Sequence, residues 1–395
     1  MQVLVFIFGL VLFIGLVLVH EWGHFWVARR NGVRAEEFGL FFPPRLWSKK
    51  LKSGMRLSFN LLPLGGFVKL KGENDADTRP HSLGAASLSA KTKIMLAGVT
   101  MNLLAGLLIL TVLAWIGMPK LLTQDNIGQD QFTVARDTKV VRQEVLVGAI
   151  QPGSPAAKAG FKSTDQLVSI SNGRQSRPVK TTQQIHNATQ VFAGQKVQVT
   201  YKRAGQTLTN SVQLLSKPAV QASLNTNNPK GYLGIVPVSL QIQRSTWSAP
   251  VVAVGLSWQV VKLTFVGLGH ALGGLGSTIA GGITGNHQAR VNGQTQASSQ
   301  VGGPVAIGVA LWDYGSLGIN FMLFLIALIS LTLALMNALP IPALDGGRLF
   351  MMLVSRGIFR RPLSRATEEW VVGASFALLL GLVALITVVD VKRFF

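Results

Sequence analysis

Long apolar runs separated by polar stretches dominate the 395-residue chain and predict four membrane-spanning helices. The runs cover residues 1–28, Ile94–Ile116, Ile319–Leu339 and Val371–Val389. Each run is close to the roughly 20 apolar residues that a helix needs to span the hydrocarbon core of a bilayer. Residues 1–19 contain no charged side chain, and neither a basic start nor a small-residue cleavage site marks them as a removable signal. We therefore expect the first run to remain as a transmembrane helix.

A fifth apolar stretch, Ala249–Gly269, is interrupted by Lys262 and by glycines, and His270 follows it. This mixture favours an amphipathic helix that lies on the membrane surface over a fifth span. The next stretch, residues 275–300, is rich in Gly, Ser and Gln and predicts a flexible linker.

The segment between the second and third spans, residues 117–248, has a different character. It is polar and contains short alternating stretches, QKVQVTYKR and GQTLTNSVQLL, that are typical of half-buried strands. At about 130 residues it is long enough to form a separate domain.

Charged residues make up only 13% of the chain, whereas soluble globular proteins carry about 25%. The composition therefore indicates a membrane protein with some soluble mass attached. The formal net charge of +21 comes largely from basic residues in two loops between spans, within 29–93 and 356–365. The positive-inside rule places both loops in the cytoplasm, and both termini and residues 117–248 outside it. Because the basic residues follow the topology, a nucleic-acid partner is excluded.

The most informative motif is HEWGH at residues 20–24, inside the first apolar run. On a helix, His20 and His24 lie on one face, where both imidazoles can bind one metal ion. Glu21 lies beside them, as the general base of H-E-x-x-H zinc sites does. Each ionisable side chain at the middle of a bilayer costs about 2.5–3.5 kcal/mol, so three without a partner would oppose insertion. A buried metal site is favoured over pairing with polar groups on neighbouring helices.

A catalytic zinc site has three protein ligands and one open position. Because the chain has no cysteine, the third ligand must be Asp, Glu or His. Asp345 follows the third span in NALPIPALDGGRLF, where two prolines and two glycines interrupt the helix. Asp345 is therefore the candidate third ligand, and the alternative is that it caps the helix that follows.

Together these motifs resemble the site-2 protease family of intramembrane zinc metalloproteases, and within it the bacterial regulator-of-sigma-E branch. The resemblance covers nearly the whole chain and includes FNLLPLGGFVKLKGE (59–73), AGVTMN (97–102), GSPAAKAG (153–160), GGPVAIG (302–308) and NALPIPALDGG (337–347). It implies Zn²⁺ as the cofactor, His20, His24 and Asp345 as its ligands, and Glu21 as the catalytic base.

The resemblance also implies substrate-binding residues. Asn102 matches an asparagine near the active site, although an interhelical polar contact is an equal alternative. Asn337 matches an asparagine that binds the backbone of an unwound substrate. The stretch LSFNLLPLGGFVKLKG resembles a membrane-dipping β-hairpin, and the sequence predicts its turn over Pro63–Gly66. Gly65 and Gly66 would then lie beside an open strand edge that pairs with extended substrate.

The expected fold is a polytopic α-helical membrane protein with about four spans, a membrane-associated β-hairpin and an inserted extracytoplasmic α+β PDZ domain. A single GSPA copy predicts one PDZ domain. The expected domains are an N-terminal membrane half (1–116), the PDZ domain (117–240), a surface helix with linker (241–300) and a C-terminal membrane half (301–395).

The expected function is a metalloendopeptidase of the bacterial inner membrane that cuts transmembrane segments of single-pass proteins near the cytoplasmic side. Anti-sigma factors and remnant signal peptides are substrates by analogy alone, and the PDZ domain offers a site for a peptide ligand. Two alternatives stay open: a membrane metalloprotease that cuts juxtamembrane loops, and a non-catalytic PDZ scaffold with a structural metal. The presence of Glu21 counts against the scaffold, because a structural metal site needs no base beside it.

Overall fold

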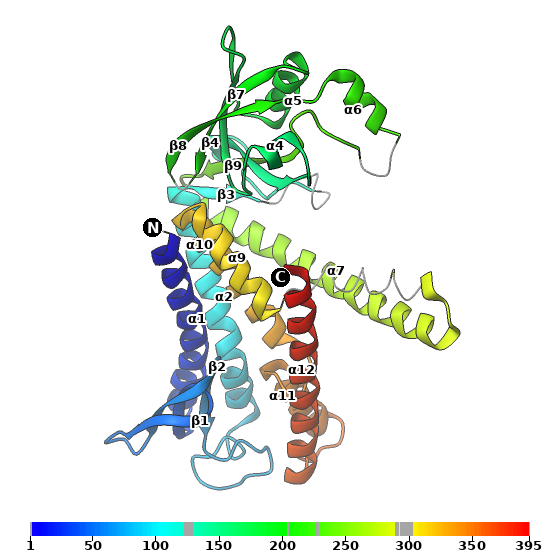
Figure 1. Cartoon of the computed structure of the whole chain (residues 1–395). Helices are drawn as coiled ribbons and strands as arrows, with labels where there is room; N and C mark the ends of the chain where they lie inside the picture. Colours follow the sequence, from blue (N-terminus) through cyan, green and yellow to red (C-terminus); the bar gives the residue numbers. More distant parts are fainter. Residues whose placement is uncertain are drawn as a thin grey trace. The chain divides into compact units, whose positions relative to one another are not determined.

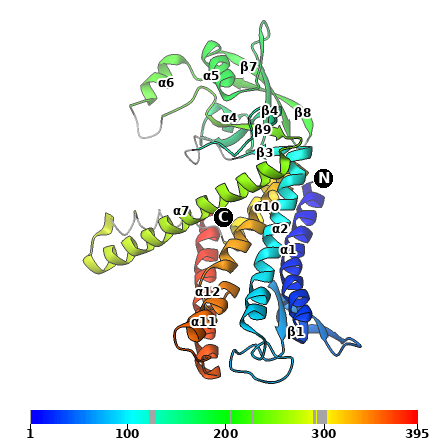
Figure 2. The same cartoon turned by 180° about the vertical axis from the view of Figure 1, so that it is seen from behind.

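The computed structural model describes residues 2–121, 129–203, 205–225, 229–288, 292 and 303–394. The chain folds into two compact units. A sheet unit contains Met1–Val5, Thr111–Val252 and Trp312–Phe324, and a helical unit contains Phe6–Leu110, Ala253–Leu311 and Leu325–Phe395. Figure 1 labels the helices and strands, and Figure 2 shows the same elements from behind.

Each of the four predicted spans is a helix. They are α1 (Gln2–Arg30), α2 (Leu88–Ile116), α10 (Ile319–Ala338) and α12 (Arg365–Phe394). Together with α7 (Ala249–Thr284), they are the five helices of the described chain that are long and apolar enough to cross a membrane. Their apolar side chains extend around most of the helix surface, which is typical of helices surrounded by lipid or protein. The elements agree with a polytopic membrane protein that carries a β domain.

Helix α7 corrects the predicted end of the helix at Gly269 and part of the predicted linker that follows it. It continues to Thr284, well beyond Gly269, so the linker prediction is wrong for residues 275–284. Glycine lowers helix stability, but here Ala, Leu and Ile separate the glycines and supply helix-forming apolar positions. Of the remaining predicted linker, residues 285–288 are described, with His287 and Gln288 helical, and residues 289–300 apart from Asn292 lie outside the described residues. That α7 lies on the membrane surface stays a prediction.

The structure adds two shorter helices, α9 (Pro304–Ser316) and α11 (Asp345–Gly357). The sequence pattern did not predict α9. Its first turn meets Asp390 of α12, whose buried carboxylate accepts hydrogen bonds from the backbone N–H groups of Gly303 (2.9 Å) and Ala306 (3.0 Å). An acid at a helix N-terminus satisfies backbone donors that have no partner within the helix.

The predicted hairpin belongs to a small sheet with an additional strand partner and an additional turn. Strands β1 (Ala35–Lys50) and β2 (Arg56–Leu70) are antiparallel, and the chain turns at residues 51–55. This turn uses Gly54, whose φ of +83° favours glycine and whose N–H donates to the Leu51 carbonyl. Within β2 the chain reverses again between Phe59 and Gly66, because both residues pair with Leu40, which agrees with the reversal predicted over Pro63–Gly66.

The register of this small sheet divides the two long strands into four short ones. Their order is 45–50, 56–60, 37–40 and 66–70, because Arg56–Phe59 pairs with β1 on both sides. Among the described pairings, segment 66–70 pairs only with residues 35–40 of β1. It is therefore an edge strand, with one side open to a further strand.

The sheet unit contains a seven-stranded antiparallel sheet in the order β3-β9-β4-β5-β7-β8, with β6 paired to β5. Its strands are β3 (Met118–Lys120), β4 (Lys139–Ile150), β5 (Gln166–Ser171), β6 (Ser176–Pro178), β7 (Lys196–Arg203), β8 (Gln206–Gln213) and β9 (Ile235–Arg244). The predicted alternation of QKVQVTYKR is confirmed, because Val197, Val199 and Tyr201 of β7 are buried. They pack in a core with residues from α4 (Pro155–Lys158) and α5 (Thr182–Val191), while α6 (Lys217–Ser223) precedes β9.

Candidate metal centre

The two histidines of the HEWGH motif lie on one face of α1 and are buried. Four residues separate them, so their rings are neighbours, with centroids 4.8 Å apart in an edge-to-face arrangement. Their Nε2 atoms are 3.2 Å apart. The sequence prediction that one ion can reach both imidazoles agrees with this geometry.

Asp345 joins the histidines from the far end of the chain. Its Oδ2 atom is 3.1 Å from His20 Nε2 and 3.0 Å from His24 Nε2. Asp345 is the first residue of α11, but the N-cap position is Leu344, which makes no side-chain capping bond. The carboxylate therefore faces the histidines, which favours the ligand interpretation over the capping alternative.

The distances among the three atoms fit a tetrahedral metal ion. Bonds of 2.0–2.1 Å from zinc to nitrogen or oxygen place neighbouring ligand atoms about 3.3 Å apart. The three observed separations are 3.0, 3.1 and 3.2 Å, close to one face of such a tetrahedron. His20, His24 and Asp345 are also the one group among the described residues with metal-ligand spacing.

Hydrogen bonds at the outer ring nitrogens support this assignment. His24 Nδ1 lies 2.8 Å from the carbonyl oxygen of Ile94, which can only accept, so Nδ1 carries the proton in the neutral ring. The unprotonated Nε2 then points a lone pair at the Asp345 carboxylate, an arrangement that a bound cation stabilises. The donor set therefore fits a divalent metal.

Asn102 of α2 lies at the outer nitrogen of His20, as the Ile94 carbonyl does at the outer nitrogen of His24. Its amide nitrogen is 3.3 Å from His20 Nδ1, and its buried Oδ1 has no hydrogen-bond partner. Amide orientation is assigned from such networks, and rotating the amide by 180° would let Oδ1 accept a hydrogen bond from a protonated His20 Nδ1. Ser330 of α10 donates to the Asn102 backbone carbonyl (2.7 Å), so Asn102 also lies at an interhelical polar contact. The interhelical alternative thus has a structural counterpart, and a role of Asn102 in binding substrate stays a prediction.

Two glycines allow α1 and α2 to approach each other at the centre. A Cβ at Gly98 of α2 would lie 2.6 Å from His20 Cε1 and 2.7 Å from its Nε2. A Cβ at Gly23 of α1 would lie 2.6 Å from Met101 Cγ and 2.9 Å from the Ala97 carbonyl oxygen. Small residues of this kind let membrane helices pack at short distance. Gly98 keeps the space beside the ligand nitrogens free of any side chain.

Glu21 lies between the histidines and the edge strand 66–70. A Cβ at Gly66 would lie 3.3 Å from Glu21 Cγ and 3.2 Å from Val17 Cγ1, so Gly66 packs directly against α1. The structure thus brings Gly66 next to the predicted base, and Gly65 precedes it with a φ of +143°.

Asn337 is half-buried in the last turn of α10, before the loop that leads to Asp345. In the first turn of α11, Gly346 and Gly347 lie against the backbone of Ala338 and Ile341, where a Cβ would overlap main-chain atoms. The two glycines after Asp345 are therefore needed to fold the loop over the start of α11.

Comparison with known proteins agrees with this geometry. The model of peptidase family M50 matches residues 8–382. The chain belongs to peptidase family M50. It is 29% identical to a Clostridium perfringens protein whose name describes a zinc metalloprotease, with 98% of each chain covered. It is also 30% identical to a similarly named Nostoc protein, and the alignment covers 93% of this chain and 90% of the relative. A third relative, the regulator of sigma-E protease RseP of Escherichia coli, is 25% identical, with 96% of each chain covered.

This assignment confirms the resemblance to site-2 proteases and the prediction of a metalloprotease. The family match begins in α1 and ends in α12, so it includes both histidines, Glu21 and Asp345. The candidate metal centre therefore combines residues from the two ends of the matched region.

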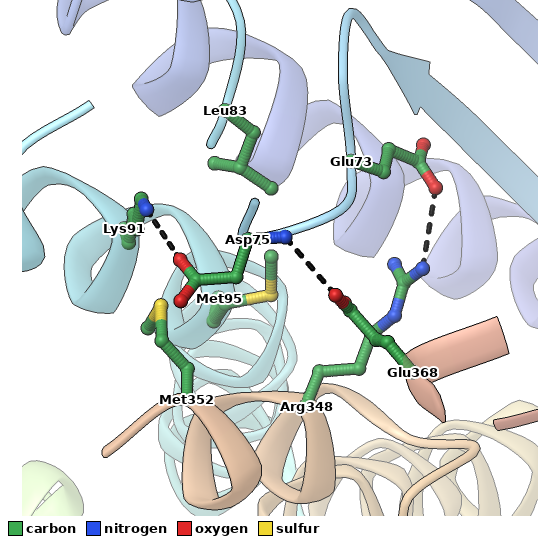
Figure 3. Close-up of a pocket in the computed structure, with 8 residues that line it drawn as sticks. All are labelled: Glu73, Asp75, Leu83, Lys91, Met95, Arg348, Met352 and Glu368. Atoms are coloured by element: carbon green, nitrogen blue, oxygen red, sulfur yellow. Dashed lines mark hydrogen bonds and ion pairs between the residues drawn. The ribbon is translucent and has the colours of Figure 1, made fainter. Parts of the chain in front are cut away.

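A second buried cluster, which we call the ion cluster, holds α11 in place. Asp75, in the loop between β2 and α2, pairs with Lys91 of α2 and accepts two hydrogen bonds from Arg356 of α11 (2.7 and 3.1 Å). Its backbone N–H donates to Glu368 of α12 (3.0 Å). Figure 3 shows Asp75 between Lys91 and Glu368, with Arg348 directed toward Glu73, to which it is joined at 3.2 Å. These bonds connect the helix that begins with Asp345 to α2, which carries Gly98 and Asn102.

The charges in the ion cluster favour ionised Asp75. Burial raises the pKa of the Asp75 carboxyl, but hydrogen bonds from Arg356 and Lys91 and their positive charges outweigh this and hold the pKa below its usual value. The Lys91 side chain is 1% exposed, and its ammonium also donates to the Gly84 carbonyl (2.7 Å). The cluster is thus largely neutralised by its own members.

Several residues at this site escaped sequence reasoning. Gly98 lies inside the AGVTMN match, but nothing in the sequence distinguishes it from other glycines in apolar helices. The Ile94 carbonyl cannot be predicted as a partner of His24, because every residue has a backbone carbonyl. Lys91 and Asp75 were counted among loop charges. A lysine at the start of an apolar helix, opposite an acid in the preceding loop, is the signal that would have indicated a buried pair.

Proposed function

We propose that this M50 metalloprotease is a zinc-dependent intramembrane endopeptidase that cleaves transmembrane segments of single-pass proteins. One observation carries the proposal: three ligand atoms within 3.2 Å of one another, with Glu21 beside them, on a helix apolar enough to cross a membrane. A soluble protease has no need to place such groups in an apolar helix, where each costs about 2.5–3.5 kcal/mol.

His20, His24 and Asp345 are the residues that would hold the ion. When bound, zinc supplies a Lewis acid that polarises the substrate carbonyl and makes water a better nucleophile. Ile94 and Asn102 fix the orientation of the imidazoles through their outer nitrogens, a role that partners of metal-binding histidines commonly have.

Glu21 would act as general base and then general acid. Its carboxylate takes a proton from the attacking water and later gives it to the leaving amine. The Glu21 side chain packs against Gly66, which ties the base to the edge strand. Water attack needs an exposed carbonyl, so the substrate helix must unwind before cleavage.

The edge strand 66–70 offers a place for the unwound substrate. Its open side can pair with an extended chain by strand addition, with Gly65 and Gly66 lining the approach. Asn337, in the turn before the Asp345 loop, would bind the substrate backbone. Asn102 is better suited to orient His20 than to bind substrate, because its side chain is 1% exposed.

The domain and topology assignments belong to the same proposal. Residues 117–240 would form one extracytoplasmic PDZ domain, supported by an antiparallel sheet with α4 beginning in the GSPA motif. The other assigned parts are 1–116, 241–300 and 301–395. The basic loops support a cytoplasmic-side active site in the inner membrane of a bacterium, with both termini outside. One relative is named a regulator of sigma-E protease, which supports anti-sigma factors as a substrate class.

The decisive experiment compares wild type with Glu21→Gln on a reconstituted single-pass substrate, with zinc measured in both. We expect both proteins to bind one zinc and only wild type to cut, with the cut mapped inside the hydrophobic segment by mass spectrometry. Loss of a general base lowers rates by about 10²–10⁴-fold. Glu36→Gln, at an exposed glutamate, is the control and should cut normally.

Two outcomes would contradict the proposal. Equal activity of wild type and Glu21→Gln would remove the base from the mechanism. Cleavage that maps only to loops outside the hydrophobic segment would favour a juxtamembrane protease.

A further inference from the structure

An apolar cavity of about 130 Å³ lies between α1 and the small sheet of the helical unit. Its lining includes Phe13, Ile14 and Val17 of α1, and Leu40, Phe41 and Gly65 of the sheet. None of the residues that line it carries a charge. The cavity therefore accepts an apolar group and rejects a charged one, which would lose its hydration without gaining a partner.

The cavity adjoins the proposed catalytic base. Val17 precedes Glu21 by four residues, about one helical turn, so both side chains lie on the same face of α1. Both also flank Gly66, since a Cβ at that position would lie 3.2 Å from Val17 and 3.3 Å from Glu21. One glycine of the edge strand thus separates the cavity from the group that would activate water.

The size of the cavity matches one large side chain. An apolar cavity of about 150 Å³ in a protein interior holds a benzene molecule. A cavity of about 130 Å³ is therefore large enough for the side chain of Leu, Met or Phe. Alanine would leave most of it empty.

We infer that this cavity is a specificity pocket, which receives one large apolar side chain next to the scissile bond of the substrate. A substrate that extends along strand 66–70 points alternate side chains to one face. Because Gly65 and Gly66 have no side chains, one substrate side chain can enter beside Val17 while the adjacent carbonyl approaches Glu21. The inference rests on the proposed function and adds the substrate feature that the enzyme selects.

The pocket predicts a defined preference at one position of the substrate. Leu, Met or Phe there should be cut faster than Ala, and Asp should not be cut at a measurable rate. A few methylene groups in an apolar pocket change kcat/KM by about 10- to 200-fold. Other positions near the bond should show weaker preferences.

The test uses full-length enzyme in proteoliposomes and one single-pass substrate whose cleavage site has been mapped. Each residue within three positions of the scissile bond is changed in turn to Ala, Leu, Phe and Asp, and kcat/KM is measured. Ile14→Trp fills the pocket and should lower the Leu-to-Ala ratio of kcat/KM at least 10-fold. Phe13→Ala enlarges it and should raise cleavage of a substrate with Trp at that position.

Val11→Trp is the matched control, because Val11 is exposed on the same helix and does not line the cavity. It should keep the wild-type ratio. If wild type, Ile14→Trp and Phe13→Ala share one ratio, the pocket inference fails and a lipid acyl chain becomes the better occupant. If wild type cuts none of the substrates, the proposed function itself fails, so the two failures are distinguishable.

Discussion

Two buried clusters connect α11 to the rest of the helical unit, and they balance charge in opposite ways. At the metal centre, His20, His24 and Asp345 all direct electron-pair donors at one point. In the ion cluster, three acids face three bases: Glu73, Asp75 and Glu368 lie against Lys91, Arg348 and Arg356. A surplus of donors indicates a cation that the chain does not supply, whereas a balanced set indicates a structural contact. The same helix thus begins at a candidate ligand, Asp345, and is anchored by an ion pair about three turns later, at Arg356.

Substitution of Asp345 should have the largest effect on the metal centre and little effect on the ion cluster. Asp345→Asn keeps the size of the side chain but removes a charged ligand, so we expect loss of bound zinc and at least about a 10³-fold loss of activity, because a Lewis acid contributes several kcal/mol. Zinc content by mass spectrometry and cleavage of a single-pass substrate measure both effects. Retention of one tightly bound zinc by the variant would show that Asp345 is not a ligand.

Asp75→Asn should separate folding from metal binding. Removing one member of a buried ion pair leaves its partners unpaired, which costs about 3–5 kcal/mol of stability. We expect a lower unfolding temperature in detergent, with one zinc still bound per folded molecule. Asp130→Asn, at a surface pair, is the control and should change stability little. Loss of all zinc from folded Asp75→Asn would contradict this prediction, because it would show that metal binding also depends on the ion cluster.

Gly98→Ala tests the space beside the ligands. The added methyl group would lie 2.6–2.7 Å from the His20 ring, so the histidine must move. Disturbing the surroundings of a metal ligand typically weakens metal affinity about 10–100-fold. Competition with a zinc chelator measures this loss. Gly106→Ala is the matched control on the same helix, because there the new methyl meets only the movable Leu331 side chain and an ordinary carbonyl contact.

The smallest expected effect is the pH dependence of the ion cluster. The pKa of Asp75 is lowered in the folded protein, so its contribution to stability is present above the unfolded value of about 4 and is lost as the pH falls through the folded value. The difference in unfolding temperature between wild type and Asp75→Asn should stay constant from pH 7 to pH 5 and shrink below pH 4. A difference that already shrinks between pH 7 and pH 5 would contradict the lowered pKa.

Local patterns predicted the helices and the convergence of the two histidines well. The four apolar runs became α1, α2, α10 and α12, because about 20 apolar residues specify a spanning helix without reference to the rest of the chain. His20 and His24 were predicted to converge because four-residue spacing on a helix fixes their relation. The alternation of β7 likewise placed Val197 and Val199 in the core.

Predictions that depended on pairing between distant segments were less successful. The stretch 57–72 was expected to pair with itself around Pro63–Gly66, but segment 66–70 pairs with 37–40, which lies between it and 56–60. The linker expected over 275–300 is helical up to Thr284, since composition alone ignored the apolar residues between its glycines.

By itself the sequence determined which segments are apolar enough to span a membrane, which residues can bind a metal and which glutamate stands beside them. These properties depend on side-chain chemistry and on the short-range geometry of a helix. Only the tertiary structure decided that Asp345 faces the histidines, that Ile94 and Asn102 orient them and that Gly98 keeps their space open. The contacts of His24 with Ile94 and with Asp345 join residues that are 70 and 321 positions apart. Tertiary packing brings these residues together, and no local sequence pattern encodes it.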